Sequence, residues 1–244
     1  MAVTFVTCCI TVYDVAPTGR SLEWRMSNFR HIAETGVKIV VYGCDDTMPY
    51  LTSVAESFEN VRVLRIDHEG TPVHRACSDP GLRMPGARDE VKDTAAYMAL
   101  INTKIEFIYD AVVRNVWGTD VFAWIDFNIA YVFRDLRGTL SKIKRISERP
   151  YPPDFLYIAG IWGEGGDVLD RVNWRYCGGF FIGDGASLRH FYALYREHLP
   201  AFLREHRVLV WEVNFWAWME TNAPDWKATW YRSNHDDSIV DIPA

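Results

Sequence analysis

Cysteine is scarce in this chain and lacks the spacing of a metal-binding or disulfide motif. The five cysteines, an odd number without a C-x-x-C pair, are Cys8, Cys9, Cys44, Cys77 and Cys177. Such a set predicts neither a disulfide framework nor a zinc knuckle. It is typical of a reducing compartment, so we expect a cytoplasmic protein in which each cysteine is a small buried apolar residue.

An excess of positive charge and long apolar runs are also missing. Lys and Arg together number 26 against 32 Asp and Glu, which gives a net charge of −6. This balance disfavours bulk binding to nucleic-acid phosphates. No apolar run approaches the length that spans a bilayer, and the opening residues lack the basic start of a signal peptide. We therefore expect no transmembrane segment.

What the sequence does contain is an alternation of strand-like and helix-like patterns. Strands are expected at 3–12, 37–43, 61–67 and 121–129, and amphipathic helices at 22–34, 51–58 and 88–115. Residues 68–87 are dense in Gly, Pro, His and Arg and are predicted to form a long loop. Further strands are expected at 155–161, 178–182 and 227–231, with a helix at 187–205. This order predicts a single α/β domain over residues 1–244, in which about 1–129 form a nucleotide-binding half and about 130–244 an acceptor-binding half.

The run 121–129, Val-Phe-Ala-Trp-Ile-Asp-Phe-Asn-Ile, delivers two polar side chains to the end of an apolar strand. Asp126 and Asn128 are two positions apart, so on a strand they share one face. Ligands bind beyond the strand ends of an open α/β sheet, and carboxylate and amide oxygens suit a hard cation or a polar ligand. The alternative is that both residues only cap the strand.

Three segments taken together carry a family resemblance. They are Thr103-Lys-Ile-Glu-Phe107 on a predicted helix, Phe122-Ala-Trp-Ile-Asp-Phe-Asn-Ile129, and Cys177-Gly-Gly-Phe-Phe-Ile-Gly183. In this order they resemble the HtrL/YibB-like family and, more broadly, the GT-A glycosyltransferases. The close match covers about a quarter of the chain, and the remainder agrees only in the order of its elements.

The resemblance implies a GT-A-like fold with a mixed central sheet flanked by helices, and sugar transfer from a nucleoside diphosphate sugar, usually with Mn²⁺ or Mg²⁺. It makes Asp126 the metal anchor and His235, near the C-terminus, a further ligand. Asn128 stands where the fuller motif has a second Asp, and this departure leaves metal dependence open. His235 is equally compatible with a solvated polar tail.

Several side chains are expected to contact the donor nucleotide. Lys104 would supply a point charge to the diphosphate, or else lie on a solvated helix face, and Arg88 would bind phosphate oxygens or simply be a surface charge. Strand ends are where the base and ribose would lie. The predicted donor contacts are Thr7, Tyr13, Tyr42, Asp45, Arg83, Arg88, Lys104 and Asp126.

Glu212, in Val210-Trp-Glu-Val-Asn214, is the predicted general base. Trp211 and other large apolar neighbours would partly desolvate its carboxylate and make it a stronger base, which suits an inverting displacement. The alternative is an ordinary carboxylate at a helix start. The rival acids are Asp167, Asp170 and Asp184.

These observations together predict a glycosyltransferase that uses a UDP-sugar and a glycan or other hydroxyl acceptor. Ten tryptophans, five of them between Trp162 and Trp218, suit an acceptor cleft, although core packing is the commoner role. Two alternatives stay open: an inactive glycan- or nucleotide-binding protein of the same fold, and a sugar-nucleotide hydrolase. A nucleotidyltransferase is disfavoured because residues 11–19 contain one Gly and no Lys.

Overall fold

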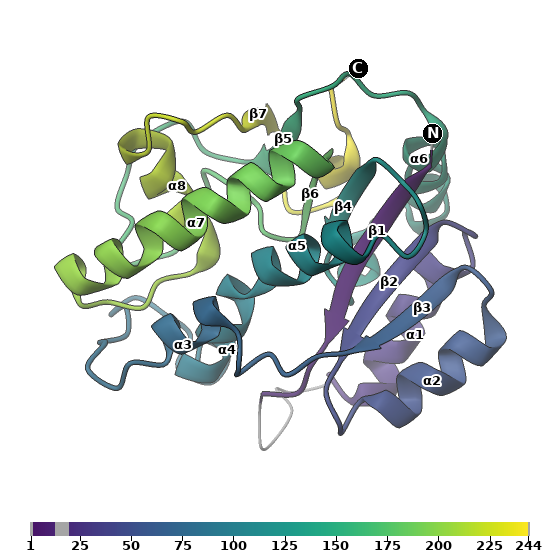
Figure 1. Cartoon of the computed structure of the whole chain (residues 1–244), viewed down its shortest axis with the longest axis horizontal. Coiled ribbons are helices and arrows are strands. Elements are labelled where there is room, and N and C mark those ends of the chain that lie inside the picture. Colours follow the sequence, from purple (N-terminus) through teal and green to yellow (C-terminus); the bar gives the residue numbers. More distant parts are fainter. Residues whose placement is uncertain (1, 13–19, 244) are drawn as a thin grey trace.

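The computed structural model describes residues 2–12 and 20–243, and these form a layered α/β structure around one sheet. Seven strands follow the order β3-β2-β1-β4-β6-β5-β7. Neighbouring strands are parallel from β3 to β4, β6 runs antiparallel to β4 and β5, and β7 is parallel to β5. The predicted mixed central sheet flanked by helices is confirmed (Figure 1).

The strands are short, and the inner ones are strongly apolar, as expected where a sheet is buried on both faces, whereas the edge strands β3 and β7 carry exposed polar residues. Their bounds are β1 Val3–Cys9, β2 Lys38–Gly43, β3 Val61–Arg65, β4 Val121–Ile125, β5 Leu156–Gly160, β6 Phe180–Asp184 and β7 Thr229–Arg232. Side chains alternate between the two faces, so Phe5 packs into one core cluster and Val6 into the other.

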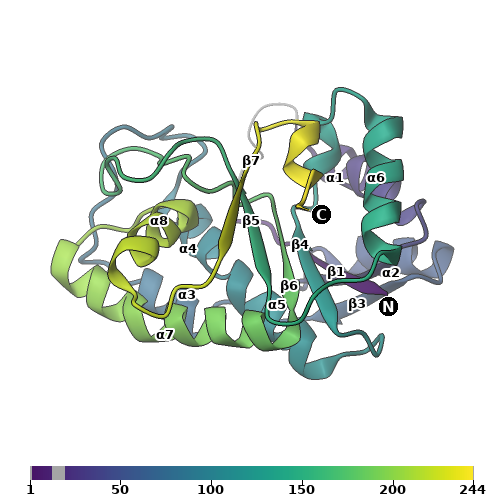
Figure 2. The same cartoon turned by 90° about the horizontal axis from the view of Figure 1, so that it is seen from above.

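The helices divide between these two faces (Figure 2). One face is covered by α1 Leu22–Ala33, α2 Met48–Ser57 and α6 Leu136–Glu148. The other is covered by α3 Pro72–Cys77, α4 Ala95–Asn102, α5 Lys104–Arg114, α7 Gly185–His206 and α8 Glu212–Asn222. Two short 3₁₀ turns, η1 Ile129–Val132 and η2 Asp237–Val240, complete the elements.

Three expectations about local structure are wrong. The predicted helix 88–115 begins only at Ala95, where Thr94 caps it, and it breaks at Thr103, whose hydroxyl bonds back to the Ala99 carbonyl. The predicted loop 68–87 contains α3, which starts at Pro72 in the first-turn position that proline tolerates. Strand β4 ends at Ile125 rather than at residue 129, since the Ile129 N–H turns back to the Asp126 carbonyl.

Among the residues that the structure describes, none of the helices combines the length and apolarity needed to cross a membrane.

Candidate active site

Asp126 lies at the point where the sheet topology favours a ligand site. It follows β4 directly. Strands β1 and β4 are neighbours in the sheet; β2 and β3 extend the sheet on the β1 side, and β6, β5 and β7 extend it on the β4 side. Ligands of open α/β sheets bind outside the carboxyl ends of strands at such a switch point. Here a cavity of about 640 Å³ opens, lined by Asp126 and by Ile10 and Thr11 just beyond β1. We call it the Asp126 cavity.

One oxygen of Asp126 is held by the protein and the other is free to meet a ligand. Oδ1 accepts a hydrogen bond from the Trp124 indole at 2.8 Å and lies 3.0 Å from the Lys104 Nζ. The side chain as a whole is 41% exposed, so it reaches the cavity. Trp124 itself is buried under α5 and fixes the carboxylate from below. The carboxylate is therefore oriented before any ligand arrives.

Lys104 is a buried ammonium with three oxygen neighbours. It donates to Glu212 Oε1 at 2.9 Å and to the Gly178 carbonyl at 3.0 Å, in addition to its ion pair with Asp126. Two of its three N–H groups thus donate hydrogen bonds to protein oxygens, and the charge of the ammonium also faces Asp126. Burial alone would lower the pKa of Lys104, but the carboxylates of Asp126 and Glu212 hold that pKa above its usual range. The side chain is thus charged and internal, not a solvated cation.

Gly178 is needed for this arrangement. A Cβ built on Gly178 would lie 2.1 Å from Glu212 Oε1 and 3.3 Å from Lys104 Nζ. Only glycine lets the backbone approach the ion pair this closely. The absence of a side chain at Gly178, just before β6, therefore makes room for the contact between Lys104 and Glu212.

Glu212 opens α8 and lines the same cavity, but it is more buried than Asp126. Its side chain is 6% exposed, and its Oε1 is engaged by Lys104. A proton from an acceptor hydroxyl would therefore have to go to Oε2. The structure thus brings together Asp126, Lys104 and Glu212, three of the predicted site residues.

The lining of the Asp126 cavity as a whole carries more cations than anions. The cations are Arg20, Arg25, Arg88, Lys92 and Lys104, and the acids are Asp89, Asp93, Asp126 and Glu212. Arg25 lies over the Phe127 ring and Arg20 over the Tyr131 ring, at 5.8 and 5.1 Å from the centroids. Stacked guanidinium groups are pre-organised to bind phosphate. The cavity is therefore suited to an anionic ligand.

The donor set for a divalent cation fits poorly. Asn128 lines the cavity and its Oδ1 has no hydrogen-bond partner among the described residues, so this oxygen is available to a ligand. With β4 ending at Ile125, however, Asn128 does not share a strand face with Asp126. His235 lines the cavity, and burial lowers its pKa, which leaves a neutral imidazole. In the part of the chain that the structure describes, no three His, Cys, Asp or Glu side chains are grouped as a metal ion requires. The Lys104 ammonium already lies against Oδ1 of Asp126, so a metal ion bound to the other oxygen would lie close to a like charge.

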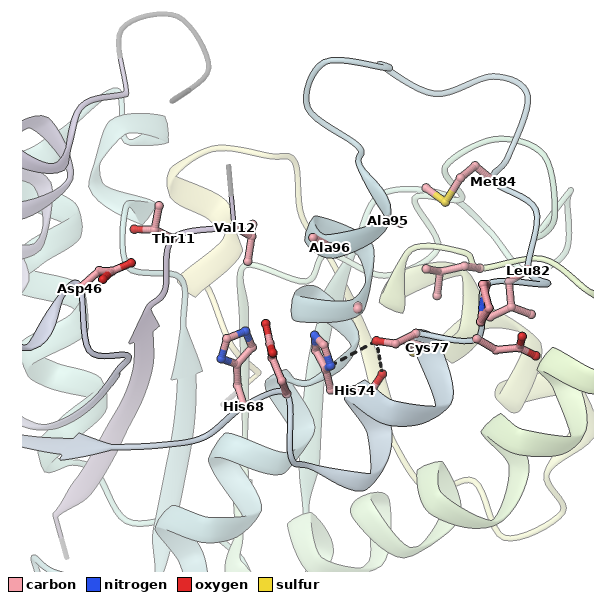
Figure 3. Close-up of a pocket in the computed structure, with 16 residues that line it drawn as sticks. Thr11, Val12, Asp46, His68, His74, Cys77, Leu82, Met84, Ala95 and Ala96 are labelled. Carbon is pink, nitrogen blue, oxygen red and sulfur yellow. Dashed lines mark hydrogen bonds between the residues drawn. The ribbon is translucent and has the colours of Figure 1, made fainter. Parts of the chain in front are cut away.

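A second cavity, of about 610 Å³, lies beside the first and shares Thr11 and Val12 with it. We call it the His68 cavity (Figure 3). His68 and His74 meet edge to face in its floor, with ring centroids 5.2 Å apart, and Asp46, beyond β2, lines the same side as Thr11. Ala95, Ala96 and Ala99 of α4 form a wall of small side chains. Such a wall leaves room for a flat ring.

Four predicted donor contacts lie outside both cavities. Thr7 is buried within β1, and Tyr42 is buried against Phe107 and donates its hydroxyl to Asp110. Asp45 pairs with Arg65 on the surface, whereas its neighbour Asp46 lines the His68 cavity. Arg83 pairs through its backbone with Leu209. These side chains point away because strand alternation and a turn direct them elsewhere.

Of the other predicted residues, Arg88 lines the Asp126 cavity and Tyr13 lies outside the described residues. Among the rival acids, Asp184 caps α7 and Asp170 binds the Gly86 N–H, so both have structural partners. Of the tryptophans, Trp174 and Trp211 line the Asp126 cavity and Trp216 is core.

Sequence reasoning missed Arg20, Arg25, His68 and His74. From the sequence, Arg25 is expected on the solvent-facing side of helix α1, because no local pattern shows that this helix begins beside the end of β4. The only signal for the histidines was their place in a loop rich in polar residues directly after a strand.

Comparison with known proteins gives a fold likeness without a family. No protein-family model matches the chain, and no curated protein matches it. Among solved structures, it is similar to 4-diphosphocytidyl-2C-methyl-D-erythritol synthase from Anaerococcus prevotii, with a TM-score of 0.45, 12% identity and coverage of 96% of this chain and 87% of that chain. It is also similar to mouse xyloside xylosyltransferase 1 in its apo form, with a TM-score of 0.48, 8% identity and coverage of 96% and 86%. Likenesses of this size do not indicate a shared activity.

Proposed function

We propose that this protein is a glycosyltransferase of the GT-A type that moves a sugar from a nucleoside diphosphate sugar, with UDP favoured over GDP, to a hydroxyl acceptor. The observation that carries the proposal is Asp126: a fixed carboxylate at the topological switch point, facing a cavity whose wall holds Arg20, Arg25 and Arg88. A diphosphate is the kind of ligand that arginines at the carboxyl edge of a sheet recognise. The resemblance of the 103–107, 122–129 and 177–183 segments to GT-A enzymes agrees with this.

In this proposal the two adjoining cavities bind different parts of the donor. The diphosphate would lie in the Asp126 cavity with the arginines, and the nucleoside in the His68 cavity against the alanines of α4. Asp46 and the two histidines are hydrogen-bonding groups for ribose and base. The shared residues Thr11 and Val12 would lie beneath the junction. Trp174 and Trp211 offer stacking surfaces to an acceptor sugar.

The chemical step in this proposal is an inverting displacement. The acceptor oxygen forms a bond to the anomeric carbon as the bond from that carbon to the diphosphate oxygen breaks, and the electron pair leaves with the diphosphate. The acceptor proton passes to Oε2 of Glu212, the oxygen not engaged by Lys104. The guanidinium groups stabilise the negative charge that develops on the leaving group.

A binding protein without turnover is the second candidate, and one observation favours it. Glu212 is almost completely buried and ion-paired with Lys104, an arrangement also expected of a purely structural carboxylate. The two candidates differ in whether a bound nucleotide sugar is consumed.

The test is a panel of UDP-, GDP- and dTDP-sugars offered with simple glycan acceptors, with release of nucleotide as the readout. We expect release of a nucleoside diphosphate and a loss of about 100-fold or more in Asp126→Asn, which keeps the shape of the side chain but removes the ion pair with Lys104, the residue that also holds the proposed base Glu212. The matched control is Asp45→Asn, an exposed aspartate outside both cavities. Binding of nucleotide without release under every condition would instead establish the binding protein, and release of a monophosphate the hydrolase.

A further inference from the structure

The Lys104 Nζ occupies a cradle of three oxygens contributed by distant parts of the chain. These are Asp126 Oδ1 after β4 at 3.0 Å, Glu212 Oε1 on α8 at 2.9 Å and the Gly178 carbonyl before β6 at 3.0 Å. Two carboxylates and a carbonyl are the ligand types of a hard divalent cation. The structure fills their common centre with a tethered ammonium.

From this geometry we infer that Lys104 is the resident cation of the site and that the protein binds its anionic ligand without a divalent metal. The inference rests on the proposed function and extends it, because it identifies the Lys104 ammonium as the positive charge that balances Asp126 and Glu212 during donor binding. Lys104 is a positioning residue in this scheme, since its hydrogen bonds and ion pairs are to protein oxygens and it holds the carboxylates of Asp126 and Glu212 in place.

Charge arithmetic supports the inference. Two carboxylates and one ammonium leave a net charge of −1 at the centre of the cavity, and Arg20, Arg25, Arg88 and Lys92 in the wall outweigh Asp89 and Asp93 by two charges. The side chains that line the cavity therefore sum to a net charge of +1, and of these Arg88 also pairs with Glu90, outside the lining, at 3.5 Å. An anion is attracted without a metal, whereas a divalent cation would approach a cation-rich wall and a carboxylate that already contacts an ammonium.

Burial makes the ammonium hard to displace. The Lys104 side chain is 9% exposed and the Glu212 side chain 6%. Removing Lys104 would leave the Glu212 charge buried without a partner, which is strongly unfavourable. The vacated space would then offer two negative oxygens and a carbonyl to any small cation from solvent.

The decisive experiment is Mn²⁺ titration followed by electron paramagnetic resonance, on the wild type and on Lys104→Ala. We expect no stoichiometric Mn²⁺ binding to the wild type at micromolar concentrations, and an affinity about tenfold or more higher in Lys104→Ala, as its oxygens become free. The added affinity should vanish in Lys104→Ala/Asp126→Asn. Lys142→Ala is the matched control, because Lys142 pairs with Asp241 away from the cavity. Binding of one Mn²⁺ by the wild type at micromolar concentration, lost in Asp126→Asn, would overturn the inference.

A second measurement keeps the inference testable if Lys104→Ala does not fold. Calorimetric titration of the wild type with UDP should give the same affinity in EDTA and in Mn²⁺, within about twofold. Binding that requires Mn²⁺ would refute the inference. If UDP does not bind under either condition, the Mn²⁺ titration of the wild type alone decides. The metal result is independent of transfer, so a protein that turns over no sugar nucleotide would refute the proposed function and leave this inference standing.

Discussion

The two neighbouring cavities treat their basic groups in opposite ways. In the Asp126 cavity Lys104 stays charged, because the carboxylates of Asp126 and Glu212, 3.0 and 2.9 Å away, hold its pKa above the usual range. In the His68 cavity the titratable rings are neutral instead, since burial lowers the pKa of both His68 and His74. A group removed from water must be paired or neutral, and each cavity uses one of these solutions. The cavity with the ion-paired lysine suits the reacting diphosphate, and the cavity with the two neutral imidazole rings suits the nucleoside.

The largest effect is expected when the negative charge of Glu212 is removed, because this tests the ion-paired group that distinguishes the Asp126 cavity. Glu212→Gln keeps the shape of the side chain but removes its basicity, so we expect kcat for transfer to fall about 100-fold while KM for the donor stays within about threefold. Steady-state kinetics at saturating acceptor provide the measurement. Glu205→Gln, an exposed carboxylate near the end of α7, is the control. Unchanged kcat would reduce Glu212 to a structural partner of Lys104.

A smaller effect, on KM instead of on kcat, is expected from a change in the His68 cavity. Ala96→Leu adds volume to the wall of the His68 cavity and should raise KM for the donor about tenfold by steric conflict, with kcat nearly unchanged. Ala201→Leu, on the exposed side of α7, controls for the larger side chain. If Ala96→Leu lowered kcat and left KM alone, the nucleoside would not lie in this cavity.

The smallest effect concerns the pH dependence of folding. His68 and His74 have lowered pKa values in the folded protein, so below the ordinary value of 6.5 the unfolded chain binds more protons. Stability should therefore be constant above that pH on their account and fall as the pH drops below 6.5. Urea unfolding at several pH values measures the slope, which His68→Gln should reduce. His31→Gln, at a half-exposed position, should leave it unchanged, and equal slopes in all three proteins would contradict the expectation.

The parts of the fold that could be predicted are those recorded in local sequence. The apolar run before Asp126 predicted β4, and alternating patterns predicted a mixed sheet with helices on it. The helix 88–115 was misjudged because apolar residues keep helical spacing across Thr103, while the break depends on a hydroxyl bonding to the Ala99 carbonyl. Helix α6 was missed altogether, although Asp135 caps it and its apolar positions face the sheet.

The site could be predicted only in part, for a reason of distance along the chain. Asp126 stands at a strand end, so its position follows from a local pattern. Lys104 was expected to meet the diphosphate or lie on a solvated helix face, but it is buried, because its partners Gly178 and Glu212 are 74 and 108 residues away. No window of sequence reveals such a contact. The same holds for Arg25, which reaches the cavity from α1.

The glycine at 178 has a consequence for how the protein can evolve. Its missing side chain leaves 2.1 Å between a hypothetical Cβ and Glu212 Oε1, too little for even a methyl group. Any larger residue at 178 would displace the Glu212 carboxylate from Lys104 unless Glu212 were replaced by a shorter residue in the same step. Descendants of this chain that keep the glutamate should therefore keep the glycine.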